Sequence, residues 1–351
     1  MVKIIGLMSG TSLDGLDICY VNFDLQGTKW SYSIIKAESE EYPQDIKEKL
    51  ANAQNMMAFE YALFNSDYGL YLGQRVKAFM DRNGAEPKYI ASHGHTIFHQ
   101  PSKRFTAQIG SGAGIAAETG VDTICDFRTT DVALRGQGAP LVPVGDKNLF
   151  GDFDYCLNLG GFSNISYDNN GIRLAFDISP VNYVLNYYTR TIGLDFDCNG
   201  EMACQGRVNN ELFEKLNNLE FYTKKGPKSL GREWVEEVVI PLIDSYNITI
   251  NDKLSTFCEH VAVQLGKNIK GGKVLLTGGG AFNKYLVERI SANTPQCEYY
   301  IPDAQTVNFK EALIFAFLGA LFVYDMPNCL SSVTGARYDC IGGALYKAGV
   351  K

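Results

Sequence analysis

The sequence predicts an α/β protein made of two similar halves, with a ligand bound in a cleft between them. Each half opens with two apolar β runs joined by a turn of small residues, at Ile4 to Tyr20 and at Tyr155 to Ser166. In the second half, a strand also leads into three glycines, Gly278 to Gly280, at the start of a helix. Each turn alone is weak evidence, but the three in this order are typical of a cleft that binds phosphates from two sides.

The first hairpin carries small polar residues in its turn, namely Ser9, Gly10, Thr11, Ser12, Asp14 and Gly15. Glycine allows close approach of the backbone, and hydroxyl groups lie beside exposed amides, so this turn can surround the phosphates of a nucleotide. Asp14, with Asp17 after it, is placed to hold a metal ion directly or through water. An ordinary hairpin turn is the alternative, because the segment matches neither the Walker pattern nor a complete GxGxxG before a helix.

Composition narrows the possible partners. The chain has 351 residues, 46% of them hydrophobic, which is enough for two domains with their own cores. Its net charge of −7, without a run of Lys or Arg, argues against a nucleic-acid binder and favours a small-molecule partner. No signal core follows Met1, and the longest apolar run, Ala312 to Val323, is short for a membrane span. We therefore expect a soluble, cytoplasmic protein in which that run is a buried helix.

The cysteines are odd in number and scattered along the chain. The nine positions are Cys19, Cys125, Cys156, Cys198, Cys204, Cys258, Cys297, Cys329 and Cys340, without a Cys-x-x-Cys pair. This spacing fits neither a zinc site nor an iron–sulfur cluster, and an odd count fits a disulfide framework poorly. Reduced, mostly buried thiols are the expected state.

The first half reads as strands up to about residue 40, followed by helical spacing from Gln44 to Asn83 with Asn83-Gly84 as its stop. A buried strand is expected at Tyr89 to Ser92. Gln108 to Gly120 suits a turn and a closely packed helix start, and Thr123 to Asp126 suits another strand. We interpret the polar segment Phe127 to Gly138 as a crossing between domains.

The second half continues the same alternation, with a third strand at Leu174 to Asp177. Helices are expected at Tyr183 to Ile192, Asn209 to Leu216, Trp234 to Asp244, Asp252 to Asn268 and Asn283 to Asn293, with a strand at Lys273 to Thr277. The expected domains are residues 1–126, with a tail at 328–351 that packs back on them, and residues 127–327.

Five motifs make the chain recognisable. They are SGTSLDGLD from Ser9, SHGHTIFHQP from Ser92, DFRTTDVALRGQGAPLVP from Asp126, NLGGFSN from Asn158 and LLTGGGAFN from Leu275. Together they resemble the anhydro-N-acetylmuramic acid kinase family, within the sugar kinase, Hsp70 and actin superfamily, over residues from about 4 to 319. The resemblance implies two RNase H-like domains flanking a cleft for ATP and sugar, with Mg²⁺, in a homodimer.

The resemblance also implies a coupled reaction. In that family, ATP phosphorylates O6 of 1,6-anhydro-N-acetylmuramic acid while water opens the anhydro ring at C1, as part of cell-wall recycling. Asp177, at a strand end before Pro180 and a helix, is the expected base for that water, and its alternative role is a helix cap. The family's usual Thr-Gly-Pro-Gly-Asn reads Ile178 to Asn182 here, and Asn186 stands where a downstream acid is usual. The exact sugar is therefore left open.

Binding residues follow from the same resemblance. Nucleotide contacts are expected at the first turn, Ser9 to Gly15, and at Gly160, Gly161, Gly278, Gly279, Gly280 and Asn283. Sugar contacts are expected at His93, Thr96, Arg128, Asp131, Gln137 and Glu311. The planar fork of Arg suits the lactyl carboxylate of a muramic sugar, and Asp suits sugar hydroxyls. A salt-bridged hinge is the alternative for the Arg128 segment.

Three further residues carry less certain roles. His95 stands where the family usually has Gln, and Arg135 adds a cation of unknown purpose. We expect His93 and His95 to point to opposite faces of their strand unless it breaks at Gly94, so a shared metal is not expected and a structural role is the alternative. Glu201 is either another cleft acid or a helix-start residue.

Other functions stay open at this point. One is an ordinary sugar kinase in which Asp177 deprotonates a hydroxyl group. Another is a catalytically silent, ATP-gated sugar sensor, which the altered segment after Asp177 favours. A third is a chaperone-like or filament-forming ATP clamp, although the chain ends at Lys351 without the peptide-binding extension expected of an Hsp70.

Overall fold

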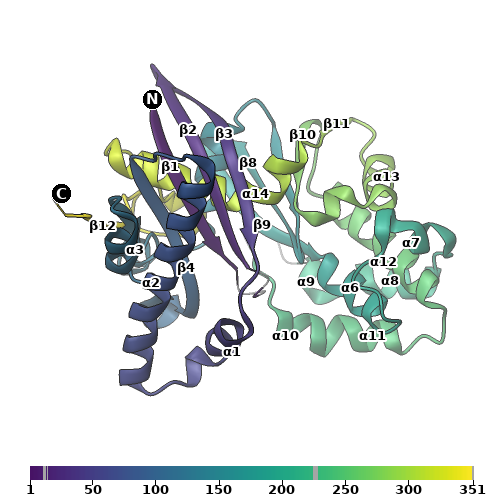
Figure 1. The fold of residues 1–351 in the computed structure, drawn as a ribbon. Coiled ribbons are helices and arrows are strands. Elements are labelled where there is room, and N and C mark those ends of the chain that lie inside the picture. The colour runs from purple at the N-terminus through teal and green to yellow at the C-terminus, as the bar shows by residue number, and fades with distance from the viewer. Residues whose placement is uncertain (11–12, 14, 224–227, 350–351) are drawn as a thin grey trace. The chain divides into compact units, whose positions relative to one another are not determined.

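A computed structural model describes residues 1–10, 13, 15–223 and 228–349. The chain divides into two compact units (Figure 1). Unit 1 comprises Met1–Leu149 together with Phe309–Lys351, and unit 2 comprises Phe150–Asn308. Both ends of the chain therefore belong to unit 1, and unit 2 is inserted within its sequence.

Unit 1 is built on a mixed sheet of seven strands within the described residues, in the order β12-β6-β4-β1-β2-β3, with β5 paired to β4. The strands are β1 (Val2–Ser9), β2 (Leu16–Gln26), β3 (Lys29–Glu40), β4 (Tyr89–Gln100), β5 (Phe105–Ile109), β6 (Thr123–Cys125) and β12 (Ala344–Tyr346). β1, β2 and β3 form an antiparallel meander, whereas β4 runs parallel to β1 and β6 runs parallel to β4. The C-terminal strand β12 pairs antiparallel with β6.

Helices cover both faces of this sheet, and β1 supplies alternate residues to each side. Ile5 and Leu7 join a core formed with α2 and α3. Gly6 faces α14 on the other side, where an added Cβ would lie 2.0 Å from the carbonyl oxygen of Ala312. In Figure 1, α2 lies in front of the sheet and α14 behind it. The helices of this unit are α1 (Gln44–Asn52), α2 (Ala58–Asn83), α3 (Gly112–Thr119), α4 (Thr129–Ala133), α5 (Val142–Leu149), most of α14 (Ala304–Val323) and α15 (Ser331–Thr334), with short turns η1 (Ala53–Asn55) and η2 (Pro101–Lys103).

Unit 2 repeats the same strand plan. Its five strands, counted within the described residues, follow the order β11-β10-β7-β8-β9. They are β7 (Tyr155–Leu159), β8 (Phe162–Asn169), β9 (Ile172–Pro180), β10 (Gly272–Thr277) and β11 (Cys297–Tyr300). Three antiparallel strands come first, and two parallel strands follow on the other side of β7. The prediction of an α/β protein with two similar halves is confirmed by this duplicated order.

The core of unit 2 consists of apolar residues from the sheet and from the helices that pack on it. Leu157 and Leu276 come from neighbouring strands, and Val184, Phe257 and Leu286 come from three helices; all five are at most 1% exposed. The helices are α6 (Asn182–Arg190), α7 (Glu201–Gln205), α8 (Asn210–Asn217), α9 (Glu220–Thr223), α10 (Arg232–Trp234), α11 (Ile240–Asp244), α12 (Ile250–Gly266) and α13 (Lys284–Asn293). Shorter turns are η3 (Cys198–Gly200), the π-helical η4 (Val235–Val239) and η5 (Gly279–Phe282).

The unit boundaries differ from the expected boundaries at 126/127 and 327/328. The segment Phe127 to Gly138, expected to cross between domains, stays in unit 1. It contains α4, and the Asp131 carboxylate accepts hydrogen bonds from Gly138 and from Thr334. The buried part of α14 also belongs to unit 1, because its backbone packs against β1 at Gly6. Both differences reflect tertiary packing that is not visible in local composition.

Three elements also differ from expectation. The helical stretch after Gln44 breaks near Met57, whose backbone is extended and whose N–H donates to Glu60 at the start of α2. β4 continues past Ser92 to Gln100 because it pairs with β5. α14 begins at Ala304, eight residues before the expected apolar run. By length and composition α14 matches a membrane span, but 72% of its most apolar window is buried in the fold.

Candidate active site

A small acidic pocket lies in unit 1 at the ends of β1, β2 and β3. Its volume is about 180 Å³, and its lining includes Met8, Gly10, Gly15, Asp17, Glu41 and Glu311. Gly15 is required there, because an added Cβ would lie 2.4 Å from the carbonyl oxygen of Glu40. The pocket therefore joins both ends of the first turn to carboxylates from β2, from the end of β3 and from α14.

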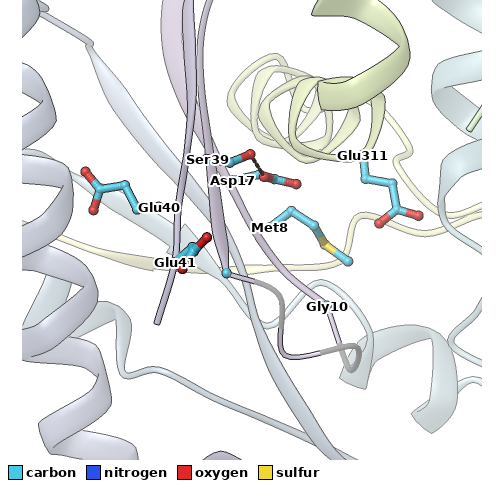
Figure 2. A pocket seen from close by; sticks show the side chains of 8 residues that line it. Met8, Gly10, Asp17, Ser39, Glu40, Glu41 and Glu311 are labelled. Carbon is cyan, nitrogen blue, oxygen red and sulfur yellow. Dashed lines mark hydrogen bonds between the residues drawn. The ribbon is translucent and has the colours of Figure 1, made fainter. Parts of the chain in front are cut away.

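Figure 2 shows how these carboxylates are oriented. Asp17 and Ser39 are paired across β2 and β3, and the Ser39 hydroxyl donates a hydrogen bond to the Asp17 carboxylate. Glu311 reaches the pocket from α14, whereas Glu40 points away from Asp17, toward Arg75 and Arg82. Carboxylate oxygens are the ligands that Mg²⁺ prefers. The residues of this pocket therefore fit a Mg²⁺ ion, next to the turn that the sequence predicts to bind phosphates.

Arg128 is held by two contacts inside unit 1. Its Nε and Nη2 lie 3.1 and 3.0 Å from Nε2 of His93, and its Nη1 donates to the carbonyl oxygen of Gly138 at 2.7 Å. Burial lowers the pKa of Arg128, and Glu311 partly opposes this effect. Burial, helped by the charge of Arg128, also lowers the pKa of His93, so the imidazole is neutral and its Nε2 accepts the hydrogen bond. Burial raises the pKa of Glu311, and the positive charge of Arg128 partly opposes this rise.

Ser9 and His95 belong to a second, separate network. The Ser9 hydroxyl lies 2.8 Å from Nδ1 of His95, 2.7 Å from the hydroxyl of Tyr42 and 3.0 Å from that of Tyr68. Burial lowers the pKa of His95 to about 4, which keeps it neutral. The hydroxyl of Ser9 is therefore used in fixing the base of the first turn, and Tyr42 and Tyr68 are two positioning residues that the sequence did not single out.

His93 and His95 do point to opposite faces, but for a different reason from the one expected. Residues two apart in a regular strand share a face. Gly94 has a φ of +70°, and the pairing of β4 with β1 shifts register here, so the strand is irregular between the two histidines. His93 thus packs against Phe315 of α14, and His95 packs against Tyr68 of α2.

The other sugar-contact candidates have varied environments. Asp131 is fully buried, and its carboxylate accepts hydrogen bonds from the Gly138 N–H and the Thr334 hydroxyl, each at 2.7 Å. Gln137 is exposed, and its backbone N–H donates to the carbonyl oxygen of Thr334. The Thr96 hydroxyl accepts from Gln108 at 3.3 Å. Two residues of uncertain role are exposed: Arg135, with a φ of +76°, and Glu201, at the start of α7.

Asp177 lies near the end of β9 in unit 2 and is half-buried. Its Oδ2 accepts a hydrogen bond from the N–H of Leu230 at 2.9 Å, and its own N–H donates to the carbonyl oxygen of Lys228 at 3.0 Å. Burial raises the pKa of Asp177, and the Leu230 hydrogen bond partly lowers it. The cap of α6 is Val181, without a side-chain capping bond, so Asp177 does not cap that helix.

A buried chain of hydrogen bonds supports the strand end that carries Asp177. The Ser179 hydroxyl lies 3.2 Å from the hydroxyl of Tyr222, which lies 2.9 Å from Nε2 of His260. Nδ1 of His260 lies 3.0 Å from Oδ1 of Asn217, and burial lowers the pKa of His260 to about 3. No local pattern predicts this chain of hydrogen bonds, because its members are up to 81 residues apart, from Ser179 to His260.

The glycine turns of unit 2 contain two kinds of position. Gly278 has a φ of +80°, and an added Cβ at Gly280 would lie 2.8 Å from Leu159, so the fold itself requires both. At Gly161 and Gly279, an added Cβ would meet nothing closer than 4.0 and 3.7 Å. A ligand that approaches the backbone would explain glycine at these two positions.

The remaining nucleotide candidates are only partly informative. An added Cβ at Gly160 would lie 3.1 Å from the side-chain nitrogen of Asn158. Asn283 is buried and caps α13, where its side chain accepts from the N–H of Leu286 at 3.0 Å. Thr11, Ser12 and Asp14 lie outside the described residues.

Comparison with known proteins gives matches over nearly the whole chain. The family model described as anhydro-N-acetylmuramic acid kinase matches residues 2–348. A protein of that name from Pseudomonas paraeruginosa is 35% identical, with 99% of this chain and 100% of the relative covered. Another from Shewanella amazonensis is 33% identical, with 98% of each covered.

Among solved structures, a ROK family glucokinase from Streptomyces griseus is 10% identical, with 90% of this chain and 98% of that chain covered, and a TM-score of 0.41. This likeness is too low to support a statement about the protein. The family model and the full-length relatives are enough by themselves, and they show that the chain belongs to the anhydro-N-acetylmuramic acid kinase family.

Proposed function

We propose that this protein converts 1,6-anhydro-N-acetylmuramic acid, ATP and water into N-acetylmuramic acid 6-phosphate and ADP. Membership of the family supports the substrate and the reaction. The observation that carries the proposal in this chain is the environment of Asp177. Its carboxylate is half-buried, has a raised pKa and is held by the backbone of Leu230, yet it does not cap α6.

Asp177 acts in this proposal as the general base. ATP would supply the γ-phosphoryl group that O6 receives, and bound Mg²⁺ would supply positive charge that offsets the negative charge of the phosphates. Asp177 accepts a proton from the water that attacks C1, so that the C1–O6 bond breaks and O6 becomes the phosphoryl acceptor. The Leu230 N–H occupies Oδ2 of the carboxylate, which fixes the orientation of Asp177. The Ser179–Tyr222–His260 chain then keeps the end of β9 in position.

The residues of unit 1 take binding roles. Gly10 and Gly15 border the predicted phosphate turn, and Asp17 would hold Mg²⁺ directly or through water. Asp14, the other predicted metal residue, lies outside the described residues. We assign the lactyl carboxylate of the sugar to Arg128, whose charge is oriented by neutral His93.

Sugar hydroxyls remain the proposed partners of Glu311, Thr96 and Gln137. Asp131 is sealed inside the fold, and we therefore give it a positioning role for the Gly136 to Gly138 segment in place of a sugar contact. A cytoplasmic homodimer is part of the same proposal.

Replacing Gly161 or Gly279 with Ala is expected to weaken ATP binding by about tenfold, or about 1.4 kcal/mol, because the added methyl group occupies the space that we assign to the nucleotide. Calorimetric titration with a non-hydrolysable ATP analogue measures this effect. Gly266→Ala, in α12 and outside both turns, is the matched control and retains parental affinity. If both turn variants bound the ATP analogue with parental affinity, the proposal that the nucleotide contacts these two turns would be wrong.

The raised pKa of Asp177 leads to a pH prediction. The base must be ionised, so kcat/KM falls as the pH falls through the folded-state pKa, and this acid limb lies above the ordinary Asp value of about 4. A pH profile of kcat/KM measures the limb. Burial also raises the pKa of Glu311, so the variant Glu311→Gln tests whether that carboxylate causes the limb. The acid limb is expected to stay in this variant. Loss of the acid limb in Glu311→Gln would show that the limb reports the ionisation of Glu311 and not of Asp177.

Mass spectrometry of the product tests the proposed function directly. The protein is incubated with ATP, Mg²⁺ and the anhydro sugar in water labelled with heavy oxygen, and the product is expected to carry phosphate at O6 and the label at C1. Phosphorylation of an open-ring sugar without turnover of the anhydro form would indicate an ordinary sugar kinase. ATP binding without any turnover would favour a sensor.

A further inference from the structure

Three side chains of types that bind metals meet inside unit 1, and one of them, Asp131, also positions the Gly136 to Gly138 segment. They are Asp131, Cys329 and Cys340, and one ligand atom from each lies within 4.8 Å of the other two. Asp131 is 0% exposed, Cys329 is 1% exposed and Cys340 is 8% exposed. The group thus brings two sulfurs and a carboxylate together in a buried setting.

The two cysteines are held on a rigid frame. Cys329 and Cys340 face each other in an antiparallel bridge, and the N–H of each donates to the carbonyl oxygen of the other at 3.1 Å. Asn328 closes the same segment: its Oδ1 accepts from the N–H of Gly342 at 2.7 Å, and its Nδ2 donates to the carbonyl oxygens of Gly342 and Leu318. The backbone of both cysteines is therefore held in place without a metal. A preorganised site requires such support.

The carboxylate is oriented in the same way. Oδ2 of Asp131 accepts from the Gly138 N–H, and Oδ1 accepts from the Thr334 hydroxyl. Carboxylates that bind metals commonly receive such hydrogen bonds, which fix their orientation and leave lone pairs for the ion. Asp131 therefore combines a fixed geometry with spare acceptor capacity beside the two sulfurs.

We propose that Asp131, Cys329 and Cys340 bind a divalent cation of the zinc class. Two thiolates favour Zn²⁺ or Cd²⁺ over Mg²⁺, which prefers oxygen ligands, and a fourth tetrahedral position is left for water. On binding, each thiol gives its proton to solvent as a sulfur–metal bond forms. One divalent cation, two thiolates and one carboxylate together carry a net charge of −1, and no oxidation takes place.

Titration of the reduced, metal-free protein with Cd²⁺ tests this site without use of kinase activity. The parent is expected to bind one equivalent with sulfur-to-cadmium ultraviolet absorption and to release two protons, measured with an indicator dye in weak buffer. Cys329→Ser and Cys340→Ser each lose most of the absorption. Thr334→Val, which removes one hydrogen bond to Asp131, weakens binding by about 10- to 100-fold but reaches the parental absorption at saturation.

Cys198→Ser is the matched control, because Cys198 is an exposed thiol outside the group. This variant is expected to bind Cd²⁺ as the parent does. Circular dichroism of each metal-free variant checks that it is folded, and if Cys329→Ser is not, Cys340→Ser and Thr334→Val carry the test. The proposal is overturned if the parent shows no sulfur–cadmium absorption. It is equally overturned if the absorption survives in the Cys329→Ser, Cys340→Ser double variant.

Discussion

Replacement of Asp177 by Asn is expected to lower kcat by about 100- to 10,000-fold, the range associated with loss of a general base. Asn has nearly the same size, and its side-chain oxygen still accepts the hydrogen bond from Leu230, so the strand end keeps its structure. ATP binding is expected to be unchanged. Single-turnover product formation in water labelled with heavy oxygen measures the chemical step, and the label at C1 disappears together with the phosphate at O6.

The matched control is Asp195→Asn, which removes another carboxylate of unit 2 at an exposed position. This variant is expected to retain the parental kcat and the label at C1. A parental kcat in Asp177→Asn would exclude Asp177 as the base. Phosphorylation that persists without the label would separate ring opening from phosphoryl transfer, contrary to the coupled reaction proposed here.

The second large effect is expected from a substitution at Gly6, which lowers the stability of unit 1. Gly6→Ala is expected to lower the free energy of unfolding by about 3 kcal/mol or more, the upper end for overpacking a core. The new Cβ would lie 2.0 Å from the carbonyl oxygen of Ala312, 2.7 Å from the backbone nitrogen of Ala316 and 2.9 Å from its Cβ. These are mostly backbone atoms of a helix that is itself buried, so they cannot move aside as a flexible side chain would. Such a loss is large against a typical total of about 5–15 kcal/mol.

Tryptophan fluorescence can report this effect for unit 1 alone. The chain has two tryptophans. Trp30 packs against Phe317 of α14 with ring centroids 5.2 Å apart, so it reports on unit 1 in a Trp234→Phe background. Gly161→Ala is the control, because its Cβ would lie 4.0 Å from its nearest neighbour and leave the unfolding midpoint unchanged. An unchanged midpoint in Gly6→Ala would contradict the packing of α14 on β1.

Local pattern was sufficient to predict the strands and hairpins that begin each half. An apolar run, a turn of small residues and a second apolar run identified β1 with β2 and β7 with β8, and the same reasoning placed α12 and α13 nearly correctly. It failed for β4, whose second part, from His95 to Gln100, mixes polar residues with Ile97 and Phe98. That part is a strand because its backbone pairs with β5, and backbone pairing leaves little trace in side-chain composition.

The candidate site shows a similar division. Residue type and resemblance predicted Asp177 as the base, and the structure excludes only its alternative role as a cap of α6. Asp131 was expected to bind sugar because a carboxylate suits hydroxyl groups. Its partner Thr334 is 203 residues away in sequence, so its burial was not predictable from local pattern. The Tyr42, Tyr68 and Ser9 network was missed for the same reason.

The discontinuous sequence of unit 1 also fixes the order in which the protein can fold on the ribosome. Domains usually fold from the N-terminal end as they are synthesised. Here, unit 2 is complete once residue 308 has emerged, whereas unit 1 still lacks β12 and most of α14. The face of β1 at Gly6 thus stays uncovered until Ala312 and Ala316 have been synthesised. The inserted unit is therefore the first that can fold to completion, and the N-terminal sheet keeps one apolar face exposed for longer.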